Sequence, residues 1–409
     1  RKKYIGEMKF MTIEEITKTQ CTGCCACMNI CNKNAITMVA DDEGFVFPKI
    51  NAEKCIICGK CYAICPGKDD NVHVESKKGY LIRLKDNILL LNSASGGAFV
   101  GIAKYMIEEY DALVVGAAVS EDLSVKHFIV DSIGELVKLQ NSKYVQSYIG
   151  NVYKRVLDFL DDGRMVLFSG TPCQIAGIYA VVPINKRERL YTIDLVCHGV
   201  PSPALLKRQL EMDSKTKQGR VIDYRFRYKN PNGKSVSSYM MMMMMMRGLP
   251  RIRRTKQDVY FNLFMQGLDF RESCYKCKYA NLKRISDFTI GDCDSKEHYL
   301  DFYPDESNSI ILVNTEKAQN LWENFQDNFD FIKLDVEREA QYNHQLAHPF
   351  KRTKQRDNIY QELLNNEWSM IQDKYTVFQS KFDRYKLLVL LNTPERIKKF
   401  LTKITQKKM

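Results

Sequence analysis

The sequence predicts an α+β module, then an α/β domain and a helical C-terminal region, along a chain of 409 residues. The expected boundaries are 1–78, 79–334 and 335–409. Three observations lead to this division. Two cysteine-rich runs flank a hairpin-like stretch near the start of the chain, strand-like and helix-like runs alternate from about residue 80, and the end of the chain has a helical, basic pattern.

The first module contains two cysteine runs with the same C-x2-C-x2-C-x3-C spacing: Cys21, Cys24, Cys27 and Cys31, then Cys55, Cys58, Cys61 and Cys65. Three thiolates on one tight loop can converge on three corners of a 4Fe-4S cubane. The fourth, about one helical turn further on, points away and serves the other cluster. The spacing therefore predicts two 4Fe-4S clusters, one held by Cys21, Cys24, Cys27 and Cys65 and the other by Cys55, Cys58, Cys61 and Cys31.

Zinc sites and disulfides are the alternatives for these eight cysteines. Zinc rarely needs two identical quartets, and disulfides are typical of exported chains. Cys25 does not fit the quartet and is predicted to be a bystander. The whole segment resembles the two-cluster bacterial ferredoxins, which implies a ferredoxin-like fold for the first module.

The rest of this module is predicted to contain short strands. Apolar runs at 35–39 and 45–48 surround an acidic turn that ends at Gly44, a pattern typical of a β-hairpin. Residues 72–75 read as a returning strand, and residues 77–79 as a linker to the next domain.

Alternating strands and helices are predicted from residue 80 onwards. We expect strands at 112–119, 164–168, from 190, at 221–228 and at 309–314, and helices at 98–110, at 152–160, after 169–177, after Pro201 and Pro203, and from the cap Thr315 to 325. This alternation predicts an α/β sheet.

Three further stretches give weaker signals. The seven methionines Met240 to Met246 predict no particular structure. The basic run from Arg251 to Lys256 suggests a solvated edge or an anion contact. Residues 383–409 carry an apolar stripe among many lysines and arginines, which suggests a packed terminal helix or, less simply, a helix lying on a membrane surface.

Composition limits the possible partners and compartment. The net charge is +12, from 61 lysines and arginines against 49 acidic residues. This charge suits an anionic partner, such as a phosphorylated cofactor, an acidic electron carrier, an anionic lipid or nucleic acid, and a solvated basic surface explains it equally well. No zinc-finger, RNP-like or homeodomain pattern indicates nucleic acid. No secretory pattern or apolar run long enough to cross a membrane is present. A cytoplasmic location, whose reducing conditions suit thiolates, is expected.

The remaining cysteines suggest a third metal centre. Cys173 and Cys197 each follow a strand at the start of a helix, and Cys274 and Cys277 have C-x2-C spacing. A helix N-terminus lowers a thiol pKa and suits a thiolate ligand. These four could hold another 4Fe-4S cluster, with Cys293 as a competing fourth ligand. Isolated buried thiols beside a small zinc site explain the spacing equally well.

Several motifs between residues 93 and 314 resemble the beta-subunit family of coenzyme F-420 hydrogenases and dehydrogenases. The matching stretches are Ser95 to Gly97, Lys143 to Ser147, Ser169 to Gly177, Asp194 to Pro203, Arg271 to Cys277 and Ser286 to Asp292. They occur in order and cover about half of the chain. A ferredoxin module ahead of such a domain also resembles stand-alone deazaflavin dehydrogenases.

The resemblance implies FAD next to a 4Fe-4S cluster held by Cys173, Cys197, Cys274 and Cys277. It implies FAD contacts at Ser95, Gly96, Gly97, Lys143, Tyr144, Gln146, Ser169, Gly170, Thr171 and Gln174. The residue types agree, because glycines allow the backbone to approach a pyrophosphate and helix starts favour anions. We expect Lys143 to neutralise a phosphate or the N1 region of the reduced flavin.

One motif departs from the family. The family commonly continues Gly-Asp with Phe-Trp-Gly, whereas this chain continues with Asp292, Cys293, Asp294 and Ser295. The aromatic wall expected at this edge of the substrate site is therefore missing. His198, beside Cys197, is either a polar residue at a helix start or part of the site.

The sequence thus predicts an iron–sulfur flavoprotein oxidoreductase, whose FAD exchanges a hydride with reduced coenzyme F-420 or a similar organic substrate and exchanges electrons with the clusters. Two alternatives remain open. One is a ferredoxin-driven reductase of another metabolite, for example in envelope polysaccharide biosynthesis. The other is an electron-relay subunit of a larger complex without its own substrate. No catalytic acid is predicted.

Overall fold

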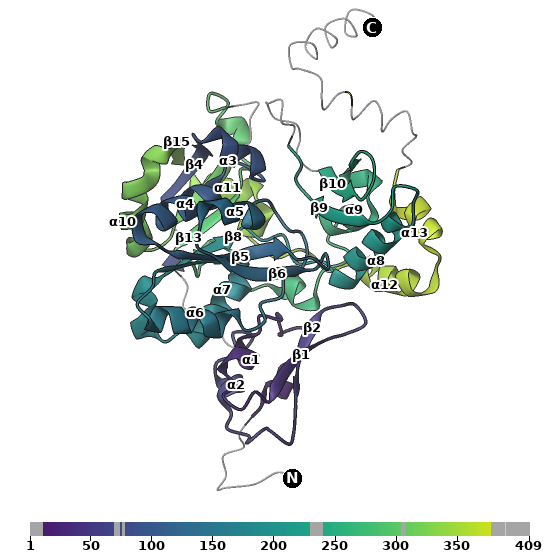
Figure 1. Cartoon of the computed structure of the whole chain (residues 1–409), viewed down its shortest axis with the longest axis horizontal. Helices are drawn as coiled ribbons and strands as arrows, with labels where there is room; N and C mark the ends of the chain where they lie inside the picture. Colours follow the sequence, from purple (N-terminus) through teal and green to yellow (C-terminus); the bar gives the residue numbers. More distant parts are fainter. Residues whose placement is uncertain are drawn as a thin grey trace, which may run out of the picture.

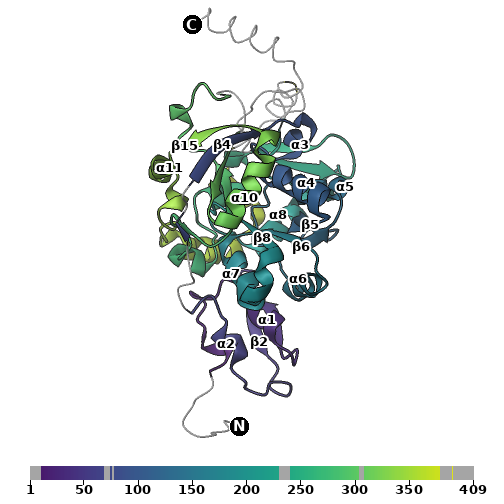
Figure 2. The ribbon, with the colours of Figure 1, turned by 90° about the vertical axis from the view of Figure 1, so that its left-hand side faces the viewer.

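The computed structural model describes residues 11–68, 74–75, 78–229, 240–303, 308–377 and 389. Figure 1 shows an N-terminal module below a large α/β body, with a smaller lobe beside that body. Figure 2 shows the same module from the side, beneath α7 (Pro172–Val181).

A mixed sheet of eight strands forms the centre of the α/β body. Its central strands β13, β8, β7 and β5 run parallel, and the outer pairings are antiparallel. In spatial order the strands are β15 (Phe329–Leu334), β4 (Lys78–Leu84), β14 (Ser309–Val313), β13 (Phe288–Asp292), β8 (Leu190–Leu195), β7 (Val166–Gly170), β5 (Leu113–Val119) and β6 (Val125–Val130). The predicted α/β class is confirmed.

Helices cover both faces of this sheet. One face packs against α4 (Ala98–Tyr110), α5 (Ile133–Leu139) and α10 (Glu316–Phe325), and the other against α6 (Val152–Asp161) and α7. The alternation of side chains in a strand explains this, because Val114 and Leu167 enter the first core while Val115 and Phe168 enter the second. The buried strands consequently read as continuous apolar runs.

Local signals in the sequence set the starts of these helices. Pro172 occupies the first turn of α7, where Thr171 and Gln174 form a capping box. Thr315 accepts a hydrogen bond from the backbone N–H of Ala318 at the start of α10, as predicted.

The N-terminal module contains a short helix, a hairpin and a second short helix. The predicted hairpin is present, with β1 paired antiparallel to β2. The elements are η1 (Ile13–Glu15), α1 (Ala26–Ile30), β1 (Ile36–Ala40), β2 (Val46–Ile50) and α2 (Lys60–Ala63). Helix α1 packs against α6 and α7 of the large body, and Ala26 lies in the same apolar core as Ile175.

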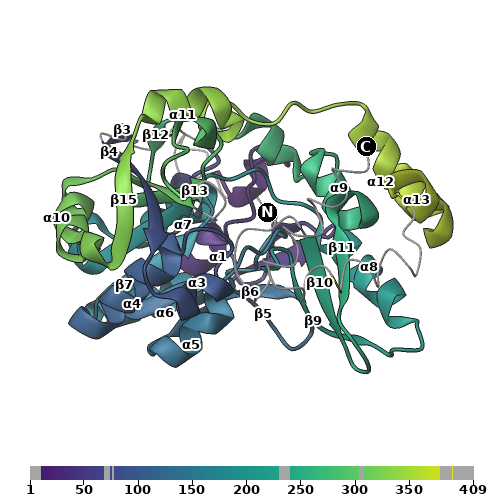
Figure 3. The same ribbon diagram turned by 90° about the horizontal axis from the view of Figure 1, so that it is seen from above.

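The smaller lobe contains a three-stranded antiparallel sheet and the helices packed around it (Figure 3). Its elements are α8 (Pro203–Ser214), β9 (Val221–Arg225), β10 (Met240–Met245), β11 (Arg251–Arg254), α9 (Val259–Met265), α12 (Gln355–Asn365) and α13 (Trp368–Tyr375). The methionine run thus forms the central strand of this sheet, with Met241, Met243 and Met245 in its core.

Short elements complete the described chain. They are β3 (Val74–Glu75) paired with β12 (Lys283–Arg284), α3 (Asn87–Asn92), α11 (Val336–Tyr342), η2 (Ile184–Arg189), η3 (Thr255–Gln257), η4 (Glu272–Lys276), η5 (Lys296–His298), η6 (Gln326–Asn328) and η7 (His344–Leu346). None of the described helices is both long and apolar enough to cross a membrane.

Two predictions about these segments are wrong. Lys78 and Gly79, expected in a linker, begin strand β4 of the large sheet, because their backbone pairs with β14 and β15. Arg253, expected at a solvated edge, is buried between the carboxylates of Asp213 and Asp258. The described part of 335–377 is helical as predicted, whereas the stripe at 383–409 lies outside the described residues, except for Val389.

We expect Trp322→Ala to lower the free energy of unfolding of the α/β body by about 3–5 kcal/mol. Trp322 is fully buried and stacks on Tyr80 with ring centroids 4.9 Å apart, so its removal leaves a large cavity. Urea unfolding followed by circular dichroism measures the loss. Trp368, which is half-buried under Arg208, provides the control, and an equal loss in Trp368→Ala would contradict this assignment of the core.

Candidate functional site

Cysteines of the two runs lie close together in the N-terminal module. We define the first thiol set as Cys21, Cys24, Cys27 and Cys65; electrostatic interactions link the Cys27 thiol to the other three and also to Cys25. Cys65 comes from the second run, so the cross-pairing of the runs agrees with the ferredoxin spacing. Burial is the main reason that the pKa of Cys24 rises to about 11.

The second thiol set is Cys55, Cys58, Cys61 and Cys31. The Cys61 thiol lies within electrostatic reach of Cys55 and Cys58, and Cys31 packs in the same apolar cluster as Cys61. Cys58 is exposed, whereas no cysteine of the first set is. The second set is therefore the more accessible of the two.

The third thiol set is Cys173, Cys197, Cys274 and Cys277. Three separate segments supply it: the start of α7, the loop after β8, and the 3-10 helix η4 with the residue that follows it. Cys197, expected at the start of a helix, lies instead in the loop six residues before α8. Burial, followed by electrostatic repulsion from the other three cysteines, raises the pKa of the Cys274 thiol. Burial above all raises the pKa of both Cys173 and Cys197 to about 12.

The raised pKa values show that these thiols need a positive charge nearby in order to ionise. Because the thiols are buried and close to one another, all of them can be thiolates only beside a strong positive charge, which bound iron would supply. Among the described residues, no three His, Cys, Asp or Glu side chains are arranged to hold a single metal ion. A cubane places its four ligands on four different iron atoms, so its ligands need not converge on one point as those of zinc do.

The first and third thiol sets are neighbours. The Cys24 thiol experiences the charge of Cys173, and Cys24 shares an apolar core with Ile175 of α7. The first and second sets meet in another apolar cluster, which contains Cys27, Cys31, Cys61 and Cys65, so the first set contacts both of the others.

The two other cysteines lie outside these sets. Cys25 is buried, its thiol donates to the carbonyl of Gly23, and it also interacts electrostatically with Cys24 and Cys27. The Cys293 thiol contacts the carboxylate of Glu339 at 3.5 Å, and none of the third-set thiols interacts with it.

A cavity of about 470 Å³ lies at the carboxyl ends of the parallel strands β7, β8 and β13. This is the edge at which open α/β sheets usually bind ligands. Eight of the ten residues predicted to contact FAD line it: Ser95, Gly97, Lys143, Tyr144, Ser169, Gly170, Thr171 and Gln174. Cys197 of the third thiol set also lines it, so the cavity and the third set share a wall.

Gly96 and Gln146 are the two predicted residues that do not line the cavity. A Cβ on Gly96 would lie 2.4 Å from the backbone nitrogen of Ser309, so glycine is needed for close packing against β14. The side-chain amide of Gln146 points to the N-terminal module, where it donates to the carbonyl of Thr22.

The cavity wall also contains buried polar atoms without a hydrogen-bond partner in the described part of the chain. They are Nδ1 of His127, Oε1 of Gln140, Oδ1 of Asn141 and Nε2 of His198. The other ring nitrogen of His127 lies 3.1 Å from the carbonyl of Ser169 and must donate to it, so Nδ1 is an acceptor. Burial lowers the pKa of His127 to about 4, which keeps the ring neutral. These atoms call for a ligand rich in N–H and O–H donors.

Lys143 adds a cation to the same wall. Its ammonium group donates to the carbonyls of Gln140 at 2.5 Å and Lys138 at 3.2 Å, and no ion pair with a carboxylate is found for it among the described residues. Burial, assisted by the charge of Arg225, lowers the pKa of Lys143 to about 7. An anion placed beside it would restore the charge.

Two carboxylates also belong to the lining of the cavity. Asp292 and Asp294 line it, and Asp292 pairs with the buried guanidinium of Arg227 at 2.6 Å. Burial, with the neighbouring charges of Glu339 and Asp292, raises the pKa of Asp294 to about 6. Polar side chains thus occupy the edge where the resembled family has Phe-Trp-Gly.

Sequence reasoning missed His127, Gln140, Asn141 and Arg227. Each lies outside the quoted motifs, and only the folding of β6, the loop after α5 and the segment after β9 brings them to the cavity. No local pattern marks such residues.

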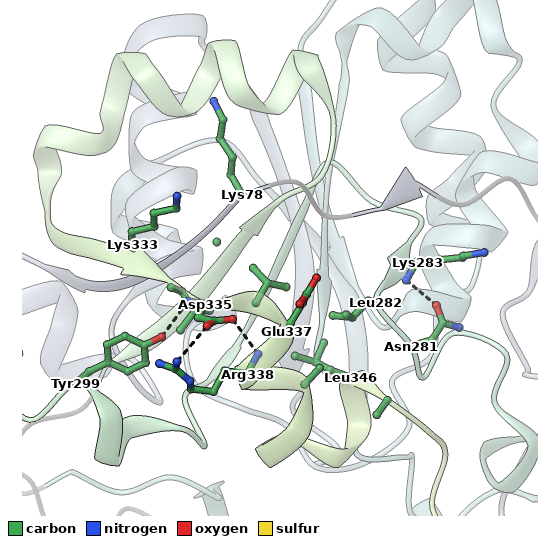
Figure 4. A pocket seen from close by; sticks show the side chains of 15 residues that line it. Lys78, Asn281, Leu282, Lys283, Tyr299, Lys333, Asp335, Glu337, Arg338 and Leu346 are labelled. Atoms are coloured by element: carbon green, nitrogen blue, oxygen red, sulfur yellow. Dashed lines mark hydrogen bonds and ion pairs between the residues drawn. The ribbon is translucent and has the colours of Figure 1, made fainter.

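A second hollow, of about 1010 Å³, is larger and more open (Figure 4). Its polar groups largely contact each other: Tyr299 accepts from the backbone of Asp335, whose carboxylate pairs with Arg338. None of the predicted site residues lines it. The smaller cavity is therefore the candidate functional site.

Three comparisons place the chain among known proteins. The family model for the C-terminal part of the beta subunit of coenzyme F420 hydrogenases and dehydrogenases matches residues 163–337. An uncharacterized polyferredoxin-like protein of Methanocaldococcus jannaschii is 39% identical over 62 residues, 13% of this chain and 34% of the relative. The chain thus spans about a third of the length of that curated relative.

A solved chain in the xenon-derivatised F420-reducing [NiFe] hydrogenase complex from Methanosarcina barkeri gives a TM-score of 0.44 at 15% identity, over 68% of this chain and 92% of that one. A likeness this distant adds no argument. The family model, in contrast, spans β7, α7, β8, Cys197 and the Cys274–Cys277 pair. The resemblance to the beta-subunit family of coenzyme F420 hydrogenases and dehydrogenases, first indicated by the sequence motifs, is thus confirmed over residues 163–337.

Proposed function

We propose that the chain is an iron–sulfur flavoprotein oxidoreductase with three 4Fe-4S clusters on its three thiol sets and FAD in the cavity beside the third. The observation that carries this proposal is the shared wall, since Cys197 belongs both to the third thiol set and to the lining of the cavity. A bound flavin would exchange two electrons as a hydride with an organic substrate and exchange them singly with the clusters.

The polar groups of the cavity support FAD as the ligand. Lys143 would neutralise a phosphate or the N1 region of the reduced ring, and the acceptors on His127, Gln140 and Asn141 would receive hydrogen bonds from the imide and the hydroxyls. The backbone at Gly170 and Thr171 lies at the start of α7, where N–H groups favour an anion. These residues bind and orient the ligand, and the buried wall excludes water from it.

The family suggests reduced coenzyme F-420 as the organic substrate, and the net charge of +12 suits its acidic tail. The carboxylate of Asp294 in the cavity lining favours a second candidate, a less anionic metabolite that the protein reduces with electrons from ferredoxin. A relay subunit in a larger redox complex would use the clusters without an organic substrate. In each case the exposed second thiol set is the proposed point of exchange with an electron-carrier protein.

The substrate is tested by mixing the anaerobically prepared holoprotein separately with reduced coenzyme F-420, NADH and NADPH, and following the flavin absorbance. We expect bleaching by reduced coenzyme F-420 alone. Bleaching only by reduced ferredoxin would favour the second candidate or the relay subunit. A preparation that binds no flavin would contradict the flavoprotein proposal itself.

Iron analysis tests the third thiol set. We expect Cys277→Ala to lose about four of about twelve iron atoms per chain, because one cubane loses a ligand while two remain intact. Cys293→Ala is the matched control, since Cys293 is also buried but contacts Glu339, and its iron content should equal that of the wild type. An unchanged iron content in Cys277→Ala would remove Cys277 from the ligand set.

The low pKa of Lys143 predicts a pH dependence of FAD binding. Without the ligand, Lys143 loses its charge as the pH rises through about 7, whereas a bound phosphate would hold the proton and raise the pKa. Binding then takes up a proton, so the Kd should rise above pH 7 by up to about tenfold per pH unit.

Titration of the flavin-free protein with FAD at several pH values, followed by fluorescence quenching, measures this slope. Lys143→Met should bind more weakly below pH 7 and lose the slope. The exposed Lys138 on α5 gives the control Lys138→Met, which should keep it. The same slope in Lys143→Met would contradict the role of Lys143.

A further inference from the structure

Arg271 is a buried cation at the junction between the N-terminal module and the α/β body. Its side chain is 1% exposed, although it precedes the 3-10 helix that carries Cys274. It donates through Nε to the carbonyl of Cys21 at 2.8 Å and through Nη2 to the carbonyl of Val46 at 3.0 Å. The guanidinium also lies 4.2 Å from the centre of the Phe47 ring. Arg271 therefore holds the module against the body.

The charge of Arg271 is not neutralised by a carboxylate among the described residues. Its remaining partners are Oε1 of Gln146 at 3.1 Å and the thiol of Cys21 at 3.5 Å. Arg284, which is also buried close to the third thiol set, differs in this respect because it pairs with Asp194 at 2.9 Å. A net positive charge therefore remains at Arg271, where little water is present to screen it.

This charge lies between two of the thiol sets. One N–H group reaches Cys21 of the first set, and the positive charge also acts on Cys173 of the third set. Gly23, in the loop of the first set, has φ +68°, and a Cβ there would lie 2.9 Å from Nη1 of Arg271. The cysteine loop is thus shaped around the guanidinium.

We propose that Arg271 raises the reduction potential of the cluster on the first thiol set, and less strongly that of the cluster on the third. It thereby determines which cluster holds an electron that passes between the electron-carrier protein and the cavity. The inference rests on the proposed function. Reduction adds one negative charge to a cluster, and a fixed positive charge with an N–H donor to a ligand sulfur stabilises that reduced state. Arg271 is a positioning residue that acts through Cys21.

The test is a potentiometric titration of the anaerobically prepared holoprotein, followed by electron paramagnetic resonance, in the wild type and in Arg271→Gln. One cluster should become harder to reduce by tenfold or more in its equilibrium constant, which is about 59 mV for one electron. Arg271→Lys keeps the charge and should shift less. Arg155→Gln removes an exposed arginine on α6 and should leave all potentials unchanged.

Because Arg271→Gln also removes contacts between the N-terminal module and the α/β body, a second variant that keeps Arg271 is needed. Gln146→Glu places a carboxylate beside the intact guanidinium, neutralises it and should lower the same potential. Unchanged potentials in Gln146→Glu and in iron-replete Arg271→Gln would overturn the inference and leave Arg271 as a clamp. Absence of clusters from the wild type would instead refute the proposed function.

Discussion

The crowding of buried thiols is the constraint on which this structure depends. Twelve cysteines gather in three sets, and burial together with mutual repulsion raises the pKa of thiols such as Cys24, Cys173 and Cys197. Ionised thiolates in such an arrangement are stable only when a positively charged group neutralises them. Iron in the proposed 4Fe-4S clusters would compensate them, and it would also account for a fourth ligand that comes from the other cysteine run.

The contacts between the N-terminal module and the α/β body determine which thiol sets are adjacent. Helix α1 packs on α6 and α7, the amide of Asn29 donates to the carbonyl of Gly150, and the buried Arg356 pairs with Glu43 of the hairpin turn. These contacts place the first thiol set beside the third and leave the second exposed. With the proposed clusters bound, the module and the α/β body would form one path from the surface to the cavity, with Arg271 at the junction.

Patterns that are local in the sequence predicted the strand–helix alternation and the hairpin, because helix caps and turns depend on near neighbours. Residues brought together by the fold were not predictable in this way. His127 lies in the middle of β6 and lines the cavity. Gly96 does not line the cavity, and it is glycine because the backbone of β14 packs closely against it. Arg253 was assigned to the surface because its partners, Asp213 and Asp258, lie in other elements.

The central claim is that three clusters lie in sequence between the surface and the cavity. Anomalous diffraction at the iron edge, from crystals grown without oxygen, tests it most directly. The account predicts three compact iron peaks, one at each thiol set, with the peak at Cys21, Cys24, Cys27 and Cys65 between the other two. An absence of iron at Cys173, Cys197, Cys274 and Cys277, or a single zinc ion there, would contradict it.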